Sequence, residues 1–329
     1  MEKKQDNLME ISDLTVRYNT DDAVVHAVNN FNLKLVRGEA RGLVGETGAG
    51  KTILALSILR LLPERVGEVT GGSIVYDGQE LLNLPEAEML PLRGKRISMI
   101  FQDPMTSLNP TQTVGDQILE VLNLHFPEMT REEKNKRVDE MMTLVGIPPQ
   151  RKKSFPHEFS GGMKQRVVIA MALVAEPELL LADEPTTALD VTIQAQILEL
   201  MKQLREKFNT SVMLITHDLG VVAQFCDSVS VVYAGRVVEY GPVEIVFQRK
   251  ENYPYTAGLF NCIPNLHDDQ PRLHPIAGHM ADPRVEYKGC CFADRCEYAT
   301  ERCRTEAPSM HVCGEHGILC HRYAEKEEF

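Results

Sequence analysis

The sequence predicts an α/β protein with a parallel core sheet and a small cysteine-rich region near its C-terminal end. Short apolar runs at residues 40–45, 97–101, 179–182 and 212–215 have the length and composition of buried strands. Helix-like segments separate these runs, and strands that alternate with helices form parallel sheets covered by helices. The cysteines are the third observation, because six of the eight lie within residues 290–320.

The first part of the chain adds further elements. Residues 8–18 and 26–35 alternate apolar and polar side chains, which predicts antiparallel strands. A helix is predicted at residues 51–62. Its apolar face consists of Leu54, Ile58 and Leu61.

The middle of the chain is helical in character. Helices are predicted at residues 114–124 and 131–145, so a helical subdomain of about residues 103–175 is expected between two core strands. Residues 229–240 predict a hairpin that turns at Ala234-Gly235-Arg236.

A change of composition marks the predicted domain boundary. From about residue 246 the chain is rich in Pro, His and Cys and loses the periodicity of helices and strands. Two regions are therefore expected: a main domain at residues 1–245 and a C-terminal extension at residues 246–329.

Charge and hydropathy argue against several classes of protein. The formal net charge of −12 disfavours a nucleic-acid-binding protein and passive docking on anionic lipid. No apolar run approaches the ~20 residues that cross a bilayer, and residues 1–6 lack the apolar core of a signal peptide. The protein is therefore expected in the cytosol, where thiols stay reduced.

A glycine-rich segment between the predicted strand at 40–45 and the helix at 51–62 carries the strongest functional signal. Its residues are Gly45, Glu46, Thr47, Gly48, Ala49, Gly50, Lys51 and Thr52. The spacing is that of a P-loop, in which glycines let backbone N–H groups surround phosphate oxygens. Lys51 would bring a positive charge to the β- and γ-phosphates of ATP, and the Thr52 hydroxyl would hold Mg²⁺. A glycine-rich turn without a ligand is the alternative interpretation.

Two carboxylates directly follow the apolar run at 179–182. At the carboxyl end of a strand, Asp183 can anchor the ligand shell of Mg²⁺, and Glu184 can orient and polarise an attacking water. Neighbouring carboxylates are also common on protein surfaces, so this pair alone does not define a catalytic site.

Ser160, Gly161 and Gly162 precede a long apolar helix. Ser160 is suited to the N-cap position, and the two glycines leave backbone N–H groups accessible at a helix N-terminus, where anions bind. An ordinary capped helix would need the same residues.

In combination and in this order, these segments resemble the motifs of the ABC transporter ATPases. The resemblance covers about residues 8–245 and implies an ABC-type P-loop ATPase fold, with an antiparallel β subdomain, a mixed core sheet and a helical insertion. It assigns residues 45–52 to the Walker A motif, 179–183 to Walker B and 160–162 to the signature motif.

The same resemblance gives roles to single residues. Glu184 is then the catalytic glutamate, Gln102 the Q-loop glutamine that contacts Mg²⁺, and His217 the switch histidine at the γ-phosphate. Tyr18 would stack on adenine, and Ala188-Leu189-Asp190 would form the D-loop. Purely structural roles are the alternatives for the tyrosine, the histidine and the glutamine.

Two further segments narrow the resemblance within this family. Residues 102–110 and the tail after residue 250, including Tyr253-Pro254-Tyr255-Thr256, are similar to the peptide/nickel import group and its D-type ATPases. This similarity implies an ATPase subunit that energises import of dipeptides or oligopeptides. Such a subunit is a peripheral protein at the cytoplasmic face of the inner membrane.

The implied partners follow from the same group. They are two transmembrane permease subunits, a second ATPase subunit that is related but not identical, and indirectly an extracytoplasmic peptide-binding protein. The signature helix of one ATPase subunit is expected to face the γ-phosphate held by the other. A nickel or metal-chelate importer is the alternative within the group, and an ABC ATPase without a transport channel is the alternative outside it.

Four of the cysteines suggest a prosthetic group. Cys290, Cys296, Cys303 and Cys320 are separated by five, six and sixteen residues, which is not the spacing of a zinc ribbon. Four thiolates suit an iron–sulfur cluster or a tetrahedral zinc ion. Residues 289–296 match the pattern Gly-Cys-x-Phe-x-x-Arg-Cys of the peptide-import ATPases, and this resemblance implies a 4Fe–4S cluster on the four cysteines.

The remaining cysteines and the histidines leave alternatives open. Zinc is the main rival of the cluster, and unligated thiols are the third interpretation. A zinc ion would take one assisting ligand from His311, His316 or His321. Cys291 and Cys313 are additional to the pattern. Cys226 and Cys262 are expected to be buried structural residues.

Overall fold

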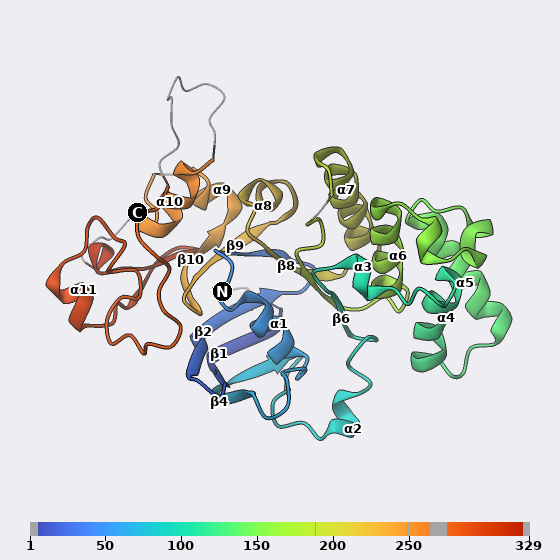
Figure 1. Cartoon of the computed structure of the whole chain (residues 1–329), viewed down its shortest axis with the longest axis horizontal. Helices are drawn as coiled ribbons and strands as arrows, with labels where there is room; N and C mark the ends of the chain where they lie inside the picture. Colours follow the sequence, from blue (N-terminus) through green and yellow to red (C-terminus); the bar gives the residue numbers. More distant parts are fainter. Residues whose placement is uncertain (1–5, 188, 249, 264–274, 325–329) are drawn as a thin grey trace. The chain divides into compact units, whose positions relative to one another are not determined.

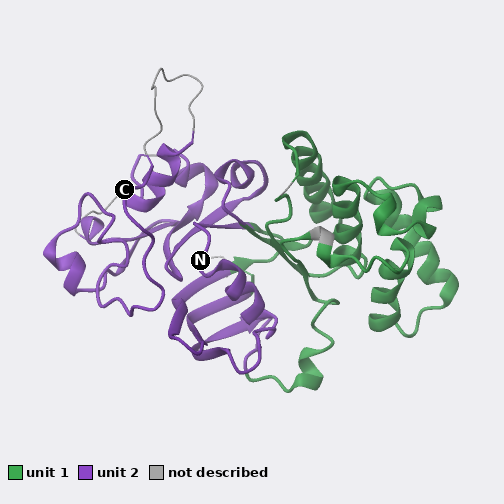
Figure 2. Ribbon diagram, in the orientation of Figure 1, with its two compact units in different colours: residues 1–8, 35–40, 83–215 green, residues 9–34, 41–82, 216–329 purple. Residues whose placement is uncertain are grey.

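The computed structural model describes residues 6–187, 189–248, 250–263 and 275–324. Internal contacts divide the chain into two compact units, which Figure 2 shows in different colours. Unit 1 comprises residues 1–8, 35–40 and 83–215, and unit 2 comprises residues 9–34, 41–82 and 216–329. Among the described residues, no helix is both long enough and apolar enough to span a bilayer.

The sheet of unit 1 contains the parallel strands β6 (Ile97–Ile100), β7 (Leu179–Asp183) and β8 (Ser211–Thr216). In the register, Leu179 lies between Ile97 on one side and Ser211 on the other. Every residue of β7 and β8 is buried. This burial on both faces explains the uninterrupted apolar runs in the sequence and confirms the predicted strands.

Unit 1 also contains helices (Figure 1). They are α2 (Glu86–Met89), α3 (Pro104–Ser107), α4 (Val114–His125), α5 (Arg131–Leu144), α6 (Gly161–Leu173) and α7 (Val191–Phe208), with 3₁₀ turns at Pro149–Lys153 and Pro156–Glu158. Thr113 caps α4 by accepting a hydrogen bond from the Asp116 N–H, and Thr130 forms a capping box with Glu133 at the start of α5. These caps explain why α4 and α5 begin where the sequence predicts.

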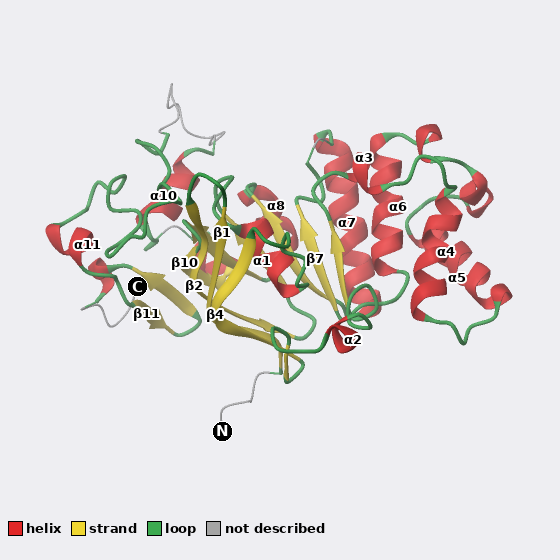
Figure 3. Cartoon of the chain, turned by 60° about the horizontal axis from the view of Figure 1, so that its bottom comes forward, coloured by secondary structure: helices red, strands yellow, loops and turns green. Residues whose placement is uncertain are grey.

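The long apolar helix α6 forms the interior of this helical region. It packs against β6, α4 and α7, and Figure 3 shows α6 and α7 side by side. Seven of its residues are buried: Gln165, Val167, Val168, Ile169, Ala170, Ala172 and Leu173. A helix that is apolar on most of its surface is therefore buried on most of its surface.

Unit 2 contains an antiparallel sheet with the strand order β2-β1-β4-β5. The strands are β1 (Asn7–Asn19), β2 (Val24–Val36), β4 (Gly67–Tyr76) and β5 (Gln79–Glu80). In the pairing of β1 with β4, Met9 lies opposite Tyr76 and Tyr18 opposite Gly67. Strands β1 and β2 confirm the antiparallel strands that the alternating pattern predicts, whereas β4 and β5 were not predicted.

The other strands of unit 2 pair in the order β11-β12-β10-β9-β3. Their bounds are β3 (Ala40–Val44), β9 (Ser228–Tyr233), β10 (Arg236–Pro242), β11 (Met310–Cys313) and β12 (His316–Leu319). β3 is parallel to β9, and the hairpin β9–β10 turns at Ala234 and Gly235, which both have positive φ as a type I′ turn requires. β12 pairs antiparallel with β10, so the end of the chain adds a hairpin to the edge of this sheet.

Short helices complete unit 2. They are α1 (Lys51–Ile58), α8 (Leu219–Phe225), α9 (Val243–Val246), α10 (Pro254–Asn261) and α11 (Glu301–Thr305), with a 3₁₀ turn at His321–Tyr323. Asp218 caps α8 by accepting hydrogen bonds from the N–H groups of Gly220 and Val221. The region after residue 246, where the sequence shows no periodicity, thus contains several short helices and strands.

The helix predicted at 51–62 is too long by one turn. α1 ends at Ile58, and Arg60 adopts a left-handed conformation with φ +53°. The N–H of Leu61 then donates to the Leu56 carbonyl and that of Arg60 to the Ser57 carbonyl, which is a Schellman ending. Leu61 lies beyond this turn and is 42 % exposed, so it does not share the buried face of the helix.

Candidate nucleotide-binding site

The glycine-rich segment 45–52 joins β3 to α1 in unit 2, as the P-loop interpretation requires. Gly48 and Gly50 have φ of +86° and +93°, and Gly50 is the N-cap of α1. A Cβ atom on Gly50 would lie 2.2 Å from the Ala27 carbonyl oxygen, and one on Gly45 would lie 2.2 Å from that of Val232. The loop therefore needs glycine for its conformation and for its close approach to neighbouring backbone.

Lys51 lies folded back into this loop. Its Nζ donates to the carbonyl oxygens of Gly45 at 2.6 Å and Glu46 at 2.9 Å, and the side chain is 6 % exposed. The Thr52 side chain, by contrast, is exposed in the first turn of α1. The loop thus combines a buried cation, a helix N-terminus and an accessible hydroxyl, which is chemistry suited to a phosphate and a magnesium ion.

Two other predicted site residues lie in unit 2. Tyr18 occupies the end of β1 opposite Gly67, and partial burial raises the pKa of its hydroxyl. His217 directly follows β8 and is exposed, and the capping residue Asp218 comes next in the chain.

The predicted carboxylates lie in unit 1. Asp183 is the last residue of β7 and is 1 % exposed, and Glu184 follows in a left-handed conformation with φ +47°. Such a conformation is uncommon for a residue other than glycine and occurs at turns as well as at functional sites. The Glu184 N–H donates to the Ile215 carbonyl at 2.9 Å, which fixes the backbone where β7 ends.

Gln102 and Thr187 hold the side chain of Glu184. Gln102 Nε2 donates to Glu184 Oε2 at 3.0 Å, and Thr187 Oγ1 donates to the same oxygen at 2.8 Å. The structure therefore places Gln102 next to the carboxylate of Glu184. Thr187 was not predicted, although its position three residues after Glu184 in the same turn is a signal that the sequence contains.

The signature segment also lies in unit 1, close to the start of α7. Ser160 is the N-cap of α6, but its side chain makes no capping hydrogen bond, so its hydroxyl is not used in the way predicted. A Cβ atom on Gly162 would lie 2.6 Å from the Ile193 side chain, and one on Gly161 would lie 3.8 Å from Leu189. The glycines therefore allow α6 and the start of α7 to approach closely.

The D-loop residues precede α7. Asp190 is its N-cap and accepts a hydrogen bond from the Ile193 N–H at 3.0 Å. Ala188 lies outside the described residues. Asp190 thus has a structural role in ending the loop, in addition to the role that the motif assigns to it.

The four cysteines of the predicted cluster site line one small cavity in unit 2. Cys290, Cys296, Cys303 and Cys320 line it together with Tyr253, Tyr298 and His321, and its volume is about 20 Å³. Burial is the largest cause that raises the pKa of Cys320 to about 11, and the neighbouring cysteines contribute to this value. In the described part of the chain, no three His, Cys, Asp or Glu side chains converge closely enough to hold one metal ion.

The other four cysteines do not line this cavity, and of His311, His316 and His321 only His321 does. Cys291 is buried with its Sγ 3.9 Å from the Tyr233 carbonyl oxygen, and burial raises its pKa to about 12. Cys313 belongs to β11, and His316 is buried against Glu239, with 2.8 Å between Nε2 and Oε1. Cys226 is buried as predicted, but Cys262 is only half-buried at the C-cap of α10.

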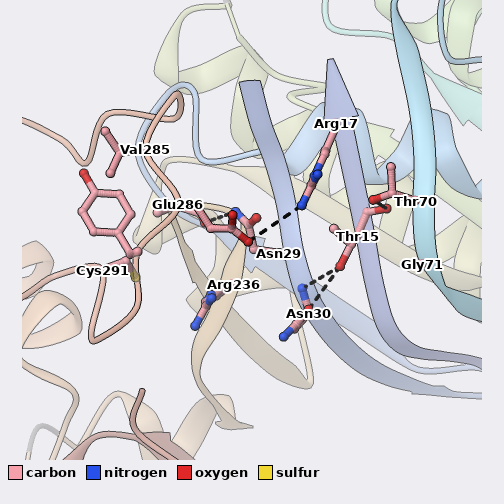
Figure 4. Close-up of a pocket in the computed structure, with 12 residues that line it drawn as sticks. Thr15, Arg17, Asn29, Asn30, Thr70, Gly71, Arg236, Val285, Glu286 and Cys291 are labelled. Atoms are coloured by element: carbon pink, nitrogen blue, oxygen red, sulfur yellow. Dashed lines mark hydrogen bonds and ion pairs between the residues drawn. The ribbon is translucent and has the colours of Figure 1, made fainter. Parts of the chain in front are cut away.

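A separate pocket of about 350 Å³ lies beside the antiparallel sheet of unit 2 (Figure 4). Its lining includes Thr15, Arg17, Asn29, Glu286 and Tyr287. Arg17 and Glu286 approach to 3.8 Å. The lining includes none of the P-loop residues, so this pocket is distinct from the candidate nucleotide site.

The chain matches two family models. Residues 28–187 match the model described as "ABC transporter", and residues 238–303 match the one described as "Oligopeptide/dipeptide transporter, C-terminal region". The first match spans the P-loop and the carboxylates, and the second contains three of the four cysteines that line the cavity.

Curated relatives resemble the chain over nearly its whole length. The oligopeptide transport ATP-binding protein OppD of Haemophilus influenzae is 47 % identical, and the match covers 98 % of each chain. OppD of Bacillus subtilis is 48 % identical over 98 % of this chain and 91 % of that protein. OppD of Escherichia coli is 48 % identical over 93 % of this chain and 90 % of that protein.

Solved structures share the ATPase fold. The ATP-binding cassette MJ0796, in a dimeric post-hydrolysis state with ADP and Pi, is 28 % identical with a TM-score of 0.64, covering 71 % of this chain and 98 % of that one. The cbiO1 protein of Clostridium perfringens, part of the ABC transporter complex cbiONQ, is 30 % identical with a TM-score of 0.65, covering 75 % of this chain and 93 % of that one.

Fold and motifs together define a P-loop ATPase of the ABC type. More specifically, the chain belongs to the ABC transporter family, in the group with the oligopeptide/dipeptide transporter C-terminal region. The fold class and the family resemblance expected from the sequence are thereby confirmed.

Proposed function

We propose that this chain is the ATP-hydrolysing subunit of an ABC importer for dipeptides or oligopeptides. The main support for this proposal is the similarity to OppD proteins at 47–48 % identity. This similarity extends through the C-terminal extension as well as the ATPase motifs. The match of residues 238–303 to the oligopeptide/dipeptide transporter C-terminal region supports this group over other ABC ATPases.

In the proposed mechanism, the backbone N–H groups of residues 45–52 bind the phosphates, and Lys51 exchanges its carbonyl partners for phosphate oxygens. Thr52 and Asp183 would hold Mg²⁺ through the hard oxygen ligands that this ion prefers. The ion, when bound, neutralises negative charge on the phosphates.

Glu184 would accept the proton of the attacking water. Gln102 and Thr187 would orient the Glu184 carboxylate for this proton transfer. His217 would donate to the γ-phosphate, and Tyr18 would stack on adenine. Ser160, Gly161, Gly162 and Asp190 would complete the site of a second ATPase subunit, because a helix N-terminus with exposed N–H groups binds phosphate.

The partners are proposed on the same basis. Two transmembrane permease subunits would carry the cargo, and a related ATPase subunit would pair with this one. This places the protein peripherally at the cytoplasmic face of the membrane. The dimeric structure of the ATP-binding cassette MJ0796 with ADP and Pi supports the pairing of two ATPase subunits.

We also propose that Cys290, Cys296, Cys303 and Cys320 hold a 4Fe–4S cluster. Four thiols around one cavity fit a polynuclear group, which takes each ligand at a different iron atom. A zinc ion fits less well, because its ligands must converge to about 2.3 Å from one point and no group of three does so among the described residues. When bound, the cluster would cross-link the extension and stabilise its fold.

Uptake of labelled di- to hexapeptides tests the function. Cells that carry a chromosomal Glu184→Gln allele are expected to lose peptide uptake, whereas the surface variant Glu206→Gln keeps it. Normal peptide uptake with normal amounts of the Glu184→Gln protein would contradict the proposal. Loss of nickel uptake in its place would indicate a metal-chelate importer.

Metal analysis of protein purified without oxygen tests the cluster. Iron and acid-labile sulfide are expected in equal amounts, and Cys303→Ser should lower both. Cys313→Ser is the matched control, because Cys313 does not line the cavity. A full equivalent of zinc without sulfide would overturn the cluster.

A further inference from the structure

The C-terminal extension forms hydrogen bonds with the P-loop at Glu46. The Arg295 guanidinium forms a bidentate pair with its carboxylate, with Nη1–Oε2 at 2.8 Å and Nη2–Oε1 at 3.1 Å. The Tyr255 hydroxyl oxygen accepts a hydrogen bond from the Glu46 N–H at 2.8 Å. Two residues more than 200 positions away in the chain therefore fix both the backbone and the side chain of one P-loop residue.

The backbone of Glu46 also holds the P-loop lysine, Lys51. Its carbonyl oxygen accepts a hydrogen bond from Lys51 Nζ at 2.9 Å and another from the Ala49 N–H at 3.2 Å. Every polar backbone group of Glu46 thus has a partner, either in the extension or within the loop. A shift of Glu46 would move the anchor of the cation that binds the phosphates.

Arg295 is itself held rigidly. Its side chain is 5 % exposed, and its Nε donates to the Ala277 carbonyl oxygen at 3.0 Å. The guanidinium also lies 5.8 Å from the ring centres of Tyr233 and Phe292. The Tyr255 ring packs against the same two rings, at 4.8 Å and 5.6 Å between centres. These residues form one aromatic cluster that fixes both Arg295 and Tyr255.

The segment before Arg295 also approaches the P-loop. A Cβ atom on Gly48 would lie 3.1 Å from the methyl group of Met280, so this side chain lies directly against the loop. The segment is fastened to the antiparallel sheet on its other side, where the His26 N–H donates to the Pro283 carbonyl at 2.7 Å. The Arg17–Glu286 ion pair seen in Figure 4 adds a second attachment.

The charge of Glu46 gives Arg295 a second effect. An unpaired carboxylate in an anion-binding loop repels phosphate, and a partly buried pair is screened by solvent less than an exposed one. The side chain of Glu46 is 32 % exposed, so its charge would act on the loop if Arg295 were absent. The bidentate pair cancels this charge and fixes its position.

We infer that Arg295 and Tyr255 are positioning residues of the nucleotide site, through which the C-terminal extension sets the affinity of the P-loop for ATP. This inference rests on the proposed assignment of residues 45–52 as the phosphate-binding loop. It gives the extension a role in the ATPase reaction that does not depend on what the cysteines bind.

Binding of a fluorescent ATP analogue to the full-length protein tests the inference. Arg295→Gln is expected to weaken binding at least tenfold, because it leaves the Glu46 carboxylate unpaired in the loop. Arg295→Lys keeps the charge without the bidentate geometry and should recover part of the loss. Tyr255→Phe keeps the ring but leaves the Glu46 N–H without its acceptor, and should weaken binding about threefold.

The double variant Glu46→Gln/Arg295→Gln separates positioning from folding. It removes the unpaired carboxylate and should bind the analogue more tightly than Arg295→Gln alone when both variants are folded by circular dichroism. Arg284→Gln is the matched control, because its ion pair with Asp282 lies within the extension. It should leave the affinity unchanged.

The outcomes distinguish the inference from the proposed function. Equal affinity of the wild type and Arg295→Gln, with both proteins folded by circular dichroism, would overturn the inference. Failure of the double variant to bind more tightly than Arg295→Gln would do the same. A wild-type protein that binds no ATP analogue would overturn the assignment of the P-loop itself.

Discussion

The two ends of strand β7 each carry a glutamate, and the two side chains are held by different kinds of partner. Glu178 directly precedes the strand and accepts hydrogen bonds from Arg96 Nε at 2.7 Å and Arg37 Nη1 at 2.6 Å. Glu184 directly follows the strand and accepts hydrogen bonds from Gln102 Nε2 at 3.0 Å and Thr187 Oγ1 at 2.8 Å.

The partners decide what each carboxylate can do. The hydrogen bond from Arg96 is the largest cause that lowers the pKa of Glu178, and Arg37 adds to it. This carboxylate is therefore held as an anion in an ion pair. The amide of Gln102 and the hydroxyl of Thr187 orient Glu184 without adding positive charge. In parallel sheets the ligand site lies at the carboxyl ends of the strands, which is the end where Glu184 lies.

The largest expected difference is in turnover. Glu184→Gln should lower ATP hydrolysis by about 10²–10⁴-fold, because the amide cannot accept the proton of the attacking water. ATP binding should be retained, since the phosphate-binding residues are unchanged. Phosphate release by the assembled complex and binding of a fluorescent ATP analogue measure the two effects.

The matched control for this prediction is Glu178→Gln, which makes the same chemical change at the other end of β7. It should keep turnover within about twofold of the wild type, because Glu178 has a structural role. Similar losses in the two variants would remove the functional contrast between the two ends of the strand.

A smaller effect is expected at Thr187. Thr187→Val removes the donor of the 2.8 Å hydrogen bond to Glu184, and turnover should fall about tenfold. Hydrogen bonds to charged groups contribute about 1.5–3 kcal/mol, and each 1.4 kcal/mol corresponds to a factor of ten. Thr143→Val on α5 is the control, since that hydroxyl donates to a carbonyl oxygen of its own helix. Unchanged turnover of Thr187→Val would mean that Gln102 alone suffices to orient the carboxylate.

At the other end of the strand the effect should be on stability. Glu178→Gln is expected to lower the free energy of unfolding by about 1 kcal/mol, because its ion pairs with Arg96 and Arg37 are about a third exposed and partly screened. Urea unfolding of the wild type and the variant measures the difference. A loss above about 3 kcal/mol would indicate a buried ion pair rather than a partly exposed one.

The smallest expected effect is that of pH on the difference in unfolding free energy between the wild type and Glu178→Gln. The native pKa of Glu178 lies below its ordinary value of 4.5, so its ion pairs stabilise the fold above that pH. The stabilisation is lost as the pH falls from 4.5 through the lower native pKa. The difference in stability between the wild type and Glu178→Gln should therefore be constant near neutral pH and shrink in acid. A difference that grows below pH 4.5 would contradict this assignment.

The core strands and the long helices could be predicted because local patterns define them. Strands β7 and β8 are buried on both faces and give continuous apolar runs, and α5 begins at a threonine with a glutamate three residues later. The strand–glycine loop–helix order around Lys51 likewise depends on neighbouring residues alone.

Other features were missed because they depend on pairing between distant segments. β12 exists as a strand because β10 offers it an edge, and its four residues carry little periodicity of their own. The end of α1 depends on a left-handed Arg60, a residue type that does not signal a helix end.

By itself the sequence determined the fold class, the P-loop, the carboxylates that end β7 and the four cysteines, since spacing along the chain encodes each of them. Only the tertiary structure decided that Thr187 and Gln102 share one oxygen of Glu184. The same is true of Arg295, which pairs with Glu46 across 249 positions of the chain. The packing of the aromatic cluster places Arg295 next to the loop. A contact that depends on such packing leaves no periodic signal in the sequence.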